Sequence, residues 1–222
     1  MTTRPALLIA IAILFSNAFT LQAQRADTTD INTLFGAGKD MDNGGWGGPS
    51  VHYTTIMGQD ALLTGLRGGW LIDHRLTLGL AGHGLVTDVP NTTYDQYLLD
   101  NGHVLHKKSQ FRMGYGGLLI EPIIAHRSAI HVSLPVIIGA GGCGYETYEP
   151  RPANFDPFSY SDNVQAFFVL EPGVELEMNL IRLVRFGVGA SYRYTTDITL
   201  PGTPSDALRG LNAGFTIKVG KF

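Results

Sequence analysis

The residues that could do chemistry begin with a histidine and a serine two positions apart, His131 and Ser133. Residues at i and i+2 point to the same side of a β-strand, so an imidazole there could accept the proton of the hydroxyl. Glu146 falls on the opposite side, about 40 Å along the same predicted strand, and cannot orient the histidine. We predict no catalytic residue. His131 and Ser133 are a weak alternative, and a hydrogen-bonded pair is the simpler interpretation.

A glycine pattern of the dinucleotide-binding type follows an apolar run, with Gly139, Gly141 and Gly144 at the required spacing. That chemistry needs a helix directly after the glycines, whose N-terminus binds the pyrophosphate. Residues 145–152 include two prolines and cannot form that helix. The chain has one cysteine, which excludes a disulfide framework and a cysteine-based zinc site. We therefore predict no cofactor and no metal site.

A further set of charged and imidazole side chains is spaced at alternating positions along apolar segments. If these segments close into a small barrel, the set points into its interior, which side chains are just able to fill. Buried charges must then be paired and hydrogen-bonded, so the simplest interpretation is a structural polar network. The predicted network comprises Arg67, Arg112, Glu171, Glu175, Arg185, Arg193, Lys218, His52 and His83.

The segments that would position these residues show a side-chain period of two, which indicates β-strands. In residues 184–195, for example, Val184, Phe186 and Val188 share one side, whereas Arg185 and Arg193 share the other. No stretch of the sequence after Ala23 shows a helical period over ten or more residues. We predict eight strands, over residues 44–56, 61–72, 76–87, 107–124, 130–146, 163–177, 184–195 and 207–222.

After a short first link (residues 57–60), the links between these segments alternate in length and in charge. Short links contain three arginines against one aspartate: Arg75, Arg127, Arg182 and Asp73. Long links (residues 88–106, 147–162 and 196–206) contain one base, Arg151, and eight acids: Asp88, Asp95, Asp100, Glu149, Asp156, Asp162, Asp197 and Asp206. Small outer-membrane barrels have short periplasmic turns, longer outer loops and an even strand number. We expect both chain termini on the periplasmic side.

The first segment predicts export. Residues 1–23 have one cation, Arg4, then an apolar run of about ten residues and a small residue, Ala23, at the cut, as a secretory signal peptide does. Residues 24–43 are polar and form a short periplasmic lead. The barrel is expected over residues 44–222.

Composition agrees with an exported barrel. The chain has 222 residues, a formal net charge of −3 and 28 glycines. Only 16% of the residues are charged, against about 25% in typical soluble domains. A nucleic-acid partner is excluded because the phosphate backbone requires a basic surface.

Alternation alone does not separate a membrane barrel from a soluble, lipocalin-like barrel, which points its apolar residues inward. Three features favour the membrane. The apolar rows are nearly free of charge, and the polar rows mix glycine with a few charges. Aromatic residues (Trp70, Tyr192, Tyr194) lie near strand ends, as in interfacial girdles. We therefore predict an all-β, eight-stranded antiparallel up-and-down transmembrane β-barrel, with the soluble ligand-binding barrel as an alternative.

The chain resembles the small eight-stranded outer-membrane barrels of Gram-negative bacteria, in the manner of OmpX and the OmpA membrane domain. The resemblance rests on export, the eight segments and the terminal Phe222. The glycine-rich runs 44–49, 67–72 and 137–142 resemble uncharacterised Bacteroidetes-type barrel proteins. This resemblance implies that Phe222 is an assembly signal read by the barrel-assembly machinery. In residues 211–219 the apolar side chains lie on the opposite side of the predicted strand from Phe222. A bulge at Gly220 could bring Phe222 onto the same side as these residues.

The pair His131 and Ser133 also faintly resembles the His-x-Ser motif of lipid A 3-O-deacylase barrels, although Leu134 replaces the asparagine that follows the serine there. A lipid A-modifying enzyme is therefore a second alternative. The main hypothesis is a non-enzymatic outer-membrane barrel of structural or surface-interaction type. Its expected partners are outer-membrane lipids, lipopolysaccharide and an extracellular partner at the acidic outer loops.

Overall fold

The computed structural model describes residues 43–124, 128–147 and 164–222. The predicted signal peptide (1–23) and nearly all of the predicted lead (24–43) lie outside these residues. So do several charges assigned above to the links: Arg127, Glu149, Arg151, Asp156 and Asp162.

The described residues form an all-β fold in which every predicted segment contains a strand, with boundaries that differ by a few residues. The strands are β1 (Asn43–Ile56), β2 (Gln59–Ile72), β3 (Leu76–Leu85), β4 (Gln110–Ile124), β5 (Ile130–Ser133), β6 (Val136–Glu146), β7 (Val164–Ile181), β8 (Val184–Thr195) and β9 (Gly210–Lys221).

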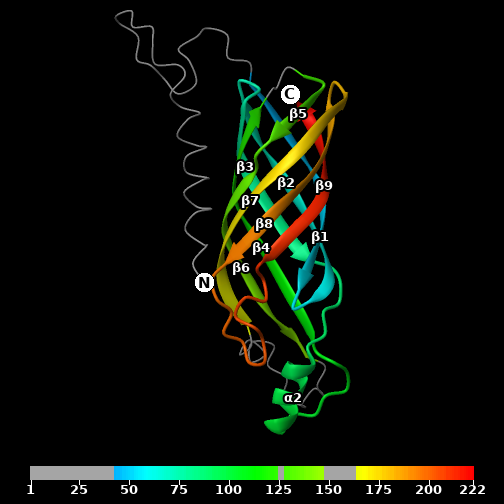
Figure 1. Ribbon diagram of the computed structural model, residues 1–222, viewed down its shortest axis with the longest axis vertical. Coiled ribbons are helices and arrows are strands. Elements are labelled where there is room, and N and C mark those ends of the chain that lie inside the picture. Colours follow the sequence, from blue (N-terminus) through cyan, green and yellow to red (C-terminus); the bar gives the residue numbers. More distant parts are fainter. Residues whose placement is uncertain (1–42, 125–127, 148–163) are drawn as a thin grey trace, which may run out of the picture. The chain divides into compact units, whose positions relative to one another are not determined.

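The strands close into a barrel (Figure 1). Pairing is antiparallel throughout, and β9 pairs with β1 to complete the ring. β5 and β6 share one place in the ring, because both pair with β4 and with β7. Their register on β4 is continuous, and the break falls at Leu134 and Pro135, where the proline lacks a backbone N–H. The barrel therefore has eight strand positions, as predicted.

Two apolar clusters fill the two ends of the barrel interior. The cluster at the end with the short turns consists of Trp46, Leu71, Ala81, Leu119, Ile123 and Ile137, with Phe222 packed against it. The cluster at the end with the long links is larger and includes Ile56, Leu63, Leu85, Val89, Phe111, Met113, Phe167, Val169, Ile198, Leu200 and Leu208. The polar interior residues lie between these clusters.

The link between β3 and β4 contains a helix, α2 (Thr92–Asp100), that the sequence analysis did not predict. Asn91 caps it, because its side-chain oxygen accepts hydrogen bonds from the backbone N–H of Thr93 (3.0 Å) and Tyr94 (3.3 Å). The Asn91 amide also donates to the carbonyl of Gly202 at 2.9 Å, which ties this link to the one between β8 and β9. Nine residues are too few for a sustained helical period in the sequence.

No helix within the described part of the chain has the length and apolar character needed to cross a membrane.

The charge of the long links differs from the prediction. β4 begins at Gln110 and β9 at Gly210, each three residues later than expected. The links therefore also contain Lys107, Lys108 and Arg209. Arg209 forms an ion pair with Asp197, one of the eight acids counted above. The acidic excess of these links is smaller than the sequence analysis inferred.

Two glycines of β6 provide a matched test of the barrel packing. A Cβ atom at Gly139 would lie 2.1 Å from the carbonyl oxygen of Gly116, whereas a Cβ at Gly142 would meet nothing within 4 Å. We expect Gly139→Ala to lower stability by about 1–3 kcal/mol, because the neighbouring backbone would have to move. Gly142→Ala should change it by less than about 0.5 kcal/mol. Denaturant unfolding in detergent measures both, and equal midpoints would contradict the packing.

Candidate functional site: a charge-balanced barrel interior

The alternation of each strand brings polar side chains from different strands into the middle of the barrel. Eight of the nine residues predicted for the interior are buried there: His52, Arg67, His83, Glu171, Glu175, Arg185, Arg193 and Lys218. Among the described residues, four cations and four carboxylates are buried, the additional carboxylates being Glu121 and Glu177. With neutral histidines, the formal charge of this interior is therefore zero.

The ninth residue, Arg112, was assigned wrongly. Its neighbours Phe111 and Met113 point into the barrel, so Arg112 points outward and its side chain is 39% exposed. There it forms ion pairs with Glu146 (3.0 Å) and Asp88 (3.1 Å) near the long-link end. The error arose because glycines in this segment conceal which side of the strand is polar.

Lys218 of β9 is the centre of the largest ionic cluster. Its ammonium nitrogen lies 2.6 Å from Glu177 and 3.2 Å from Glu175, and it also donates to Glu121. Arg67 of β2 pairs with Glu175 at 2.7 Å and with Glu121 at 3.7 Å. Glu121 and Glu175 therefore each have two cations within reach, as a buried ionic group requires.

The cluster continues toward the short-turn end of the barrel. Glu177 also binds the imidazole of His131 (3.0 Å) and lies 3.7 Å from Arg185. The Arg185 guanidinium stacks 4.0 Å from the centre of the Phe222 ring, and the Lys218 ammonium lies 4.4 Å from the Trp46 ring. Aromatic faces thus cover the cations where the polar interior ends.

Phe222 itself points inward, not toward the outer surface. The pairing of β1 with β9 keeps a constant register from Gly45 opposite Lys221 to Thr54 opposite Asn212, which leaves no bulge at Gly220. The proposed bulge is therefore wrong, and the opposite phase of Phe222 is real. Its ring closes the short-turn end by packing on the apolar cluster there.

A second polar group surrounds Glu171 of β7. Its carboxylate accepts hydrogen bonds from Tyr115 (2.5 Å), Ser191 (2.6 Å) and Asn212 (2.9 Å). Arg193 donates to the side-chain oxygen of Asn212 at 3.1 Å, so the amide links this arginine to Glu171. Three neutral donors thus satisfy this carboxylate, which the sequence analysis had assigned to the polar network without a partner.

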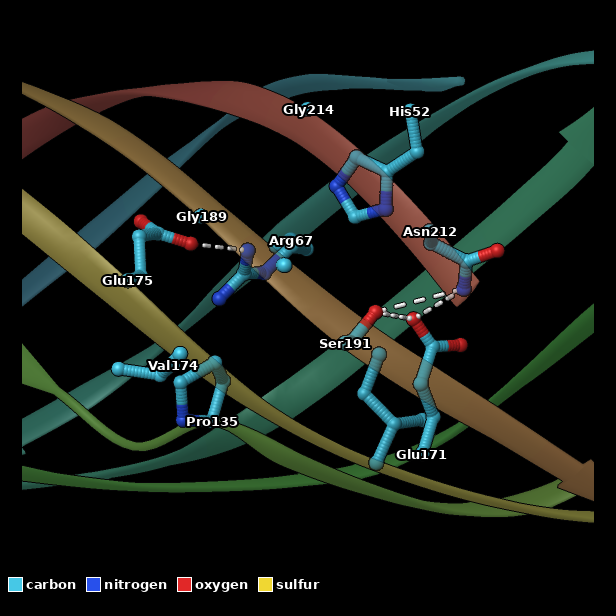
Figure 2. Close-up of a pocket in the computed structure, with 12 residues that line it drawn as sticks. His52, Arg67, Pro135, Glu171, Val174, Glu175, Gly189, Ser191, Asn212 and Gly214 are labelled. Carbon is cyan, nitrogen blue, oxygen red and sulfur yellow. Dashed lines mark hydrogen bonds and ion pairs between the residues drawn. The ribbon is translucent and has the colours of Figure 1, made fainter. Parts of the chain in front are cut away.

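The two histidines of the predicted network lie next to each other with their rings tilted. The ring centres of His52 and His83 are 4.8 Å apart, and the Nε2 atom of His83 lies 3.0 Å from the Ser50 hydroxyl. Figure 2 shows Glu175 and Arg67 on one side of a small cavity and Ser191, Glu171 and Asn212 on the other, with His52 at the top of the view next to Asn212. The cavity volume is about 20 Å³, which is room for one water molecule.

The interior offers no open metal position at its acidic cluster. Oxygen atoms of Glu121, Glu175 and Glu177 approach within 4.8 Å of one another, as metal ligands would. The Lys218 ammonium contacts all three residues, so it occupies the place that a cation would need. The Lys218 side chain therefore supplies the positive charge that a bound metal ion would otherwise supply.

The glycine pattern in residues 139–144 belongs to strand β6, which pairs with β4 and β7 over these residues. Tyr145 and Glu146, directly after the pattern, still belong to this strand, so the pattern does not stand at the helix N-terminus that pyrophosphate binding uses.

The weak catalytic alternative also meets a structural obstacle. His131 and Ser133 are both buried and point to the same side, as predicted. However, His131 binds Glu177, and the Ser133 hydroxyl has no hydrogen-bond partner among the described residues. A nucleophilic serine needs a hydrogen-bonded base, which this serine lacks.

The sequence analysis missed several interior residues. Glu177 shares the side of Glu171 and Glu175 and is the last residue of the predicted strand 163–177, but it was not assigned to the network. Glu121 lies on β4, where the glycines conceal the phase. Tyr115, Ser191 and Asn212 carry no charge and gave no signal by themselves.

Comparisons with known proteins agree with this fold. No family model and no curated relative matches the chain. Among solved structures, Neisserial surface protein A (NspA) is similar with a TM-score of 0.53 and 10% identity, covering 81% of this chain and 97% of that chain. Ail, the attachment invasion locus protein of Yersinia pestis, gives a TM-score of 0.40 and 10% identity over 80% and 95% of the two chains. The chain has the eight-stranded fold of small outer-membrane barrels. Its finer resemblance to OmpX, OmpA or Bacteroidetes barrels stays a prediction.

Removing the central ammonium tests the ionic cluster. We expect Lys218→Met to lower the free energy of unfolding by about 3–5 kcal/mol, because three buried carboxylates lose their shared cation. The matched control is Lys221→Met, on the same strand but exposed, which should change stability by less than about 1 kcal/mol. Urea titrations of both variants in detergent supply the measurement, and equal losses would refute the role of Lys218.

A second substitution tests the hydrogen-bonded group. Glu171→Ala leaves the donors of Tyr115, Ser191 and Asn212 without their acceptor, at a cost of about 1–3 kcal/mol or more. Glu146→Ala at the exposed rim serves as the control and should have little effect. Thermal unfolding followed by circular dichroism compares the two, and an unchanged midpoint for Glu171→Ala would contradict the assigned contacts.

Proposed function

We propose that the protein is an integral outer-membrane barrel with a closed interior, which acts through its presence in the membrane and through its outer links. The observation that carries the proposal is a belt of apolar side chains on the outside of the strands. Its large members, each 37–70% exposed, are Leu66, Trp70, Leu80, Leu118, Ile138, Phe168, Leu170, Val174, Leu176, Val188, Tyr194, Leu211, Phe215, Ile217 and Val219.

The belt supports a lipid environment for the outer surface. Charged residues are inside and large apolar residues are outside, which is the reverse of a soluble ligand-binding barrel. Tyr192 and Tyr194 lie at the long-link end of β8, with ring centres 4.4 Å apart, and Trp70 lies near the short-turn end of β2. Such positions suit interfacial aromatic residues at the two surfaces of a bilayer. The lipocalin-like alternative would leave this entire belt in water.

Location in the outer membrane is supported by the barrel type and by the sequence of residues 1–23. Closed antiparallel barrels that have only short turns at one end and their longer links at the other are typical of the bacterial outer membrane, and this barrel follows that pattern, with one further two-residue turn (between β1 and β2) at the long-link end. Both β1 and β9 have their chain-terminal ends at the short-turn end, which is the periplasmic end in such barrels. Before folding, Phe222 would be read by the barrel-assembly machinery, and afterwards it closes the interior.

A surface-interaction role is supported by the links at the other end. Helix α2 exposes Tyr97 and Leu99 next to the polar residues Gln96 and Asp100. Exposed aromatic and aliphatic groups on a polar background suit contact with lipopolysaccharide or with an extracellular partner. The alternative of a lipid A-modifying enzyme is disfavoured, because Ser133 is buried at the periplasmic half, away from the outer leaflet.

Fractionation tests the membrane location. The protein should remain in the outer-membrane fraction after alkaline extraction, and its unheated form should migrate faster on a gel than the heated form, because a folded barrel resists detergent. A protein recovered in the soluble periplasmic fraction would overturn the proposal.

Electrical recordings test the closed interior. Because side chains and ion pairs fill the space between the two apolar clusters, the purified barrel should give no stable channel openings in a planar bilayer. A general porin reconstituted in the same bilayer is the positive control. Reproducible open-channel steps from the folded protein would contradict the assignment of a filled barrel.

A further inference from the structure

The end of β7 and the turn that follows it expose apolar side chains at the periplasmic end of the barrel. Leu180 and Ile181 of β7 are 58% and 66% exposed, Leu183 of the turn is 55% exposed, and Arg182 between them is also exposed. Along most of β7 exposed side chains alternate with buried or partly buried ones, whereas residues 178–183 are all exposed. We refer to residues 180–183 as the apolar tip.

The apolar tip continues the belt instead of standing apart from it. Met178 precedes it on the outer side of β7 and faces Ile130 of β5, which is itself exposed. The tip is also held in place by its neighbours: the Leu183 carbonyl accepts from the Gly220 backbone N–H at 2.9 Å, and the Asn179 N–H donates to the Ala129 carbonyl at 3.0 Å. A fixed apolar surface therefore extends past the end of β8.

The turn between β2 and β3 differs, although it lies at the same end of the barrel (Figure 1). It consists of Asp73, His74 and Arg75, and its two charged side chains form an ion pair at 3.4 Å. Trp70, three residues earlier, supplies the interfacial side chain on that side. The polar turn is suited to water, so the apolar tip is a property of one side of the barrel and not of the fold.

The depth of the tip follows from its partner strand. A tilted membrane strand crosses the hydrocarbon in about 9–11 residues. Counted from Tyr194 at the outer interface, such a crossing ends near Val184, the first residue of β8. The next residues form the tip, so they fall at the boundary between the acyl chains and the headgroups, whose region adds roughly 5–7 Å on each side of the hydrocarbon.

We propose that the apolar tip inserts into the inner leaflet of the outer membrane, with phospholipid acyl chains packed on Leu180, Ile181 and Leu183 and a lipid phosphate paired with Arg182. This inference rests on the proposed function. Phospholipid is the occupant that fits, because the tip continues the lipid-facing belt, its aliphatic side chains offer no hydrogen bonds, and its one cation complements a phosphate. The barrel is thereby anchored by Trp70 on one side and by the tip on the other.

Single-cysteine variants test the insertion. On a Cys143→Ala background, Leu183→Cys reports on the tip, Arg75→Cys on the polar turn and Val188→Cys on the middle of the belt. Each variant is labelled with an environment-sensitive fluorophore and reconstituted into phosphatidylethanolamine–phosphatidylglycerol vesicles that contain lipids with brominated acyl chains. We expect the probe at Leu183 to lose fluorescence to the brominated lipids nearly as strongly as the probe at Val188, and the probe at Arg75 to lose little.

The outcomes separate the two proposals. If the probe at Val188 is not quenched, the barrel does not lie in the bilayer and the proposed function fails. If Val188 is quenched while Leu183 behaves like Arg75, the tip lies in water and the inference alone is overturned. If Leu183→Cys is shielded from a water-soluble thiol reagent in cell envelopes but not in vesicles, a protein covers the tip, which also overturns the lipid assignment.

Discussion

The constraint on which the rest of the structure depends is that eight strands enclose charged side chains in a space that water does not fill. A carboxylate or an ammonium group in such a place is stable only when it is paired and hydrogen-bonded. The interior meets this condition with four cations and four carboxylates, and Lys218 joins three of the carboxylates. Because the charged side chains point inward around the middle of the barrel, their apolar neighbours on the same strands face outward, and the same alternation makes the outer belt.

The interior must also leave room for these large side chains, and glycine residues provide that room. At Gly187 a Cβ atom would lie 2.0 Å from the Glu175 carboxylate, and at Gly141 it would lie 2.6 Å from the side chains of Phe167 and Tyr115. Inward glycines therefore stand beside the largest interior side chains, which lets them reach their partners across a narrow barrel. The glycine content that looked like a nucleotide-binding pattern in residues 139–144 has this packing role. A barrel filled in this way is a closed object, and its interactions are confined to its two ends and its outer surface.

Much of this fold could be predicted from sequence, because a side-chain period of two persists along each strand and marks both its existence and its two sides. Prediction failed where that signal is absent. Glycines around Arg112 conceal which side of β4 faces the interior. Phe222 lies on the opposite side of β9 from the apolar residues before it, although the strand has no bulge. Helix α2 is too short to show a helical period. The partners could not be predicted at all, since Lys218 meets Glu121 from 97 residues earlier in the chain. Such pairs depend on the register of strands that are not neighbours.

The most direct measurement of the central claim is a double-mutant cycle on Lys218 and Glu177, whose charged atoms lie 2.6 Å apart. Unfolding free energies of Lys218→Met, Glu177→Gln and the double variant, taken in the same phospholipid vesicles, give their coupling energy. If pairing of buried charges stabilises the barrel, the double variant loses less than the two single variants together, by at least about 1 kcal/mol. Strictly additive losses would contradict the account, because each residue would then act independently of the other.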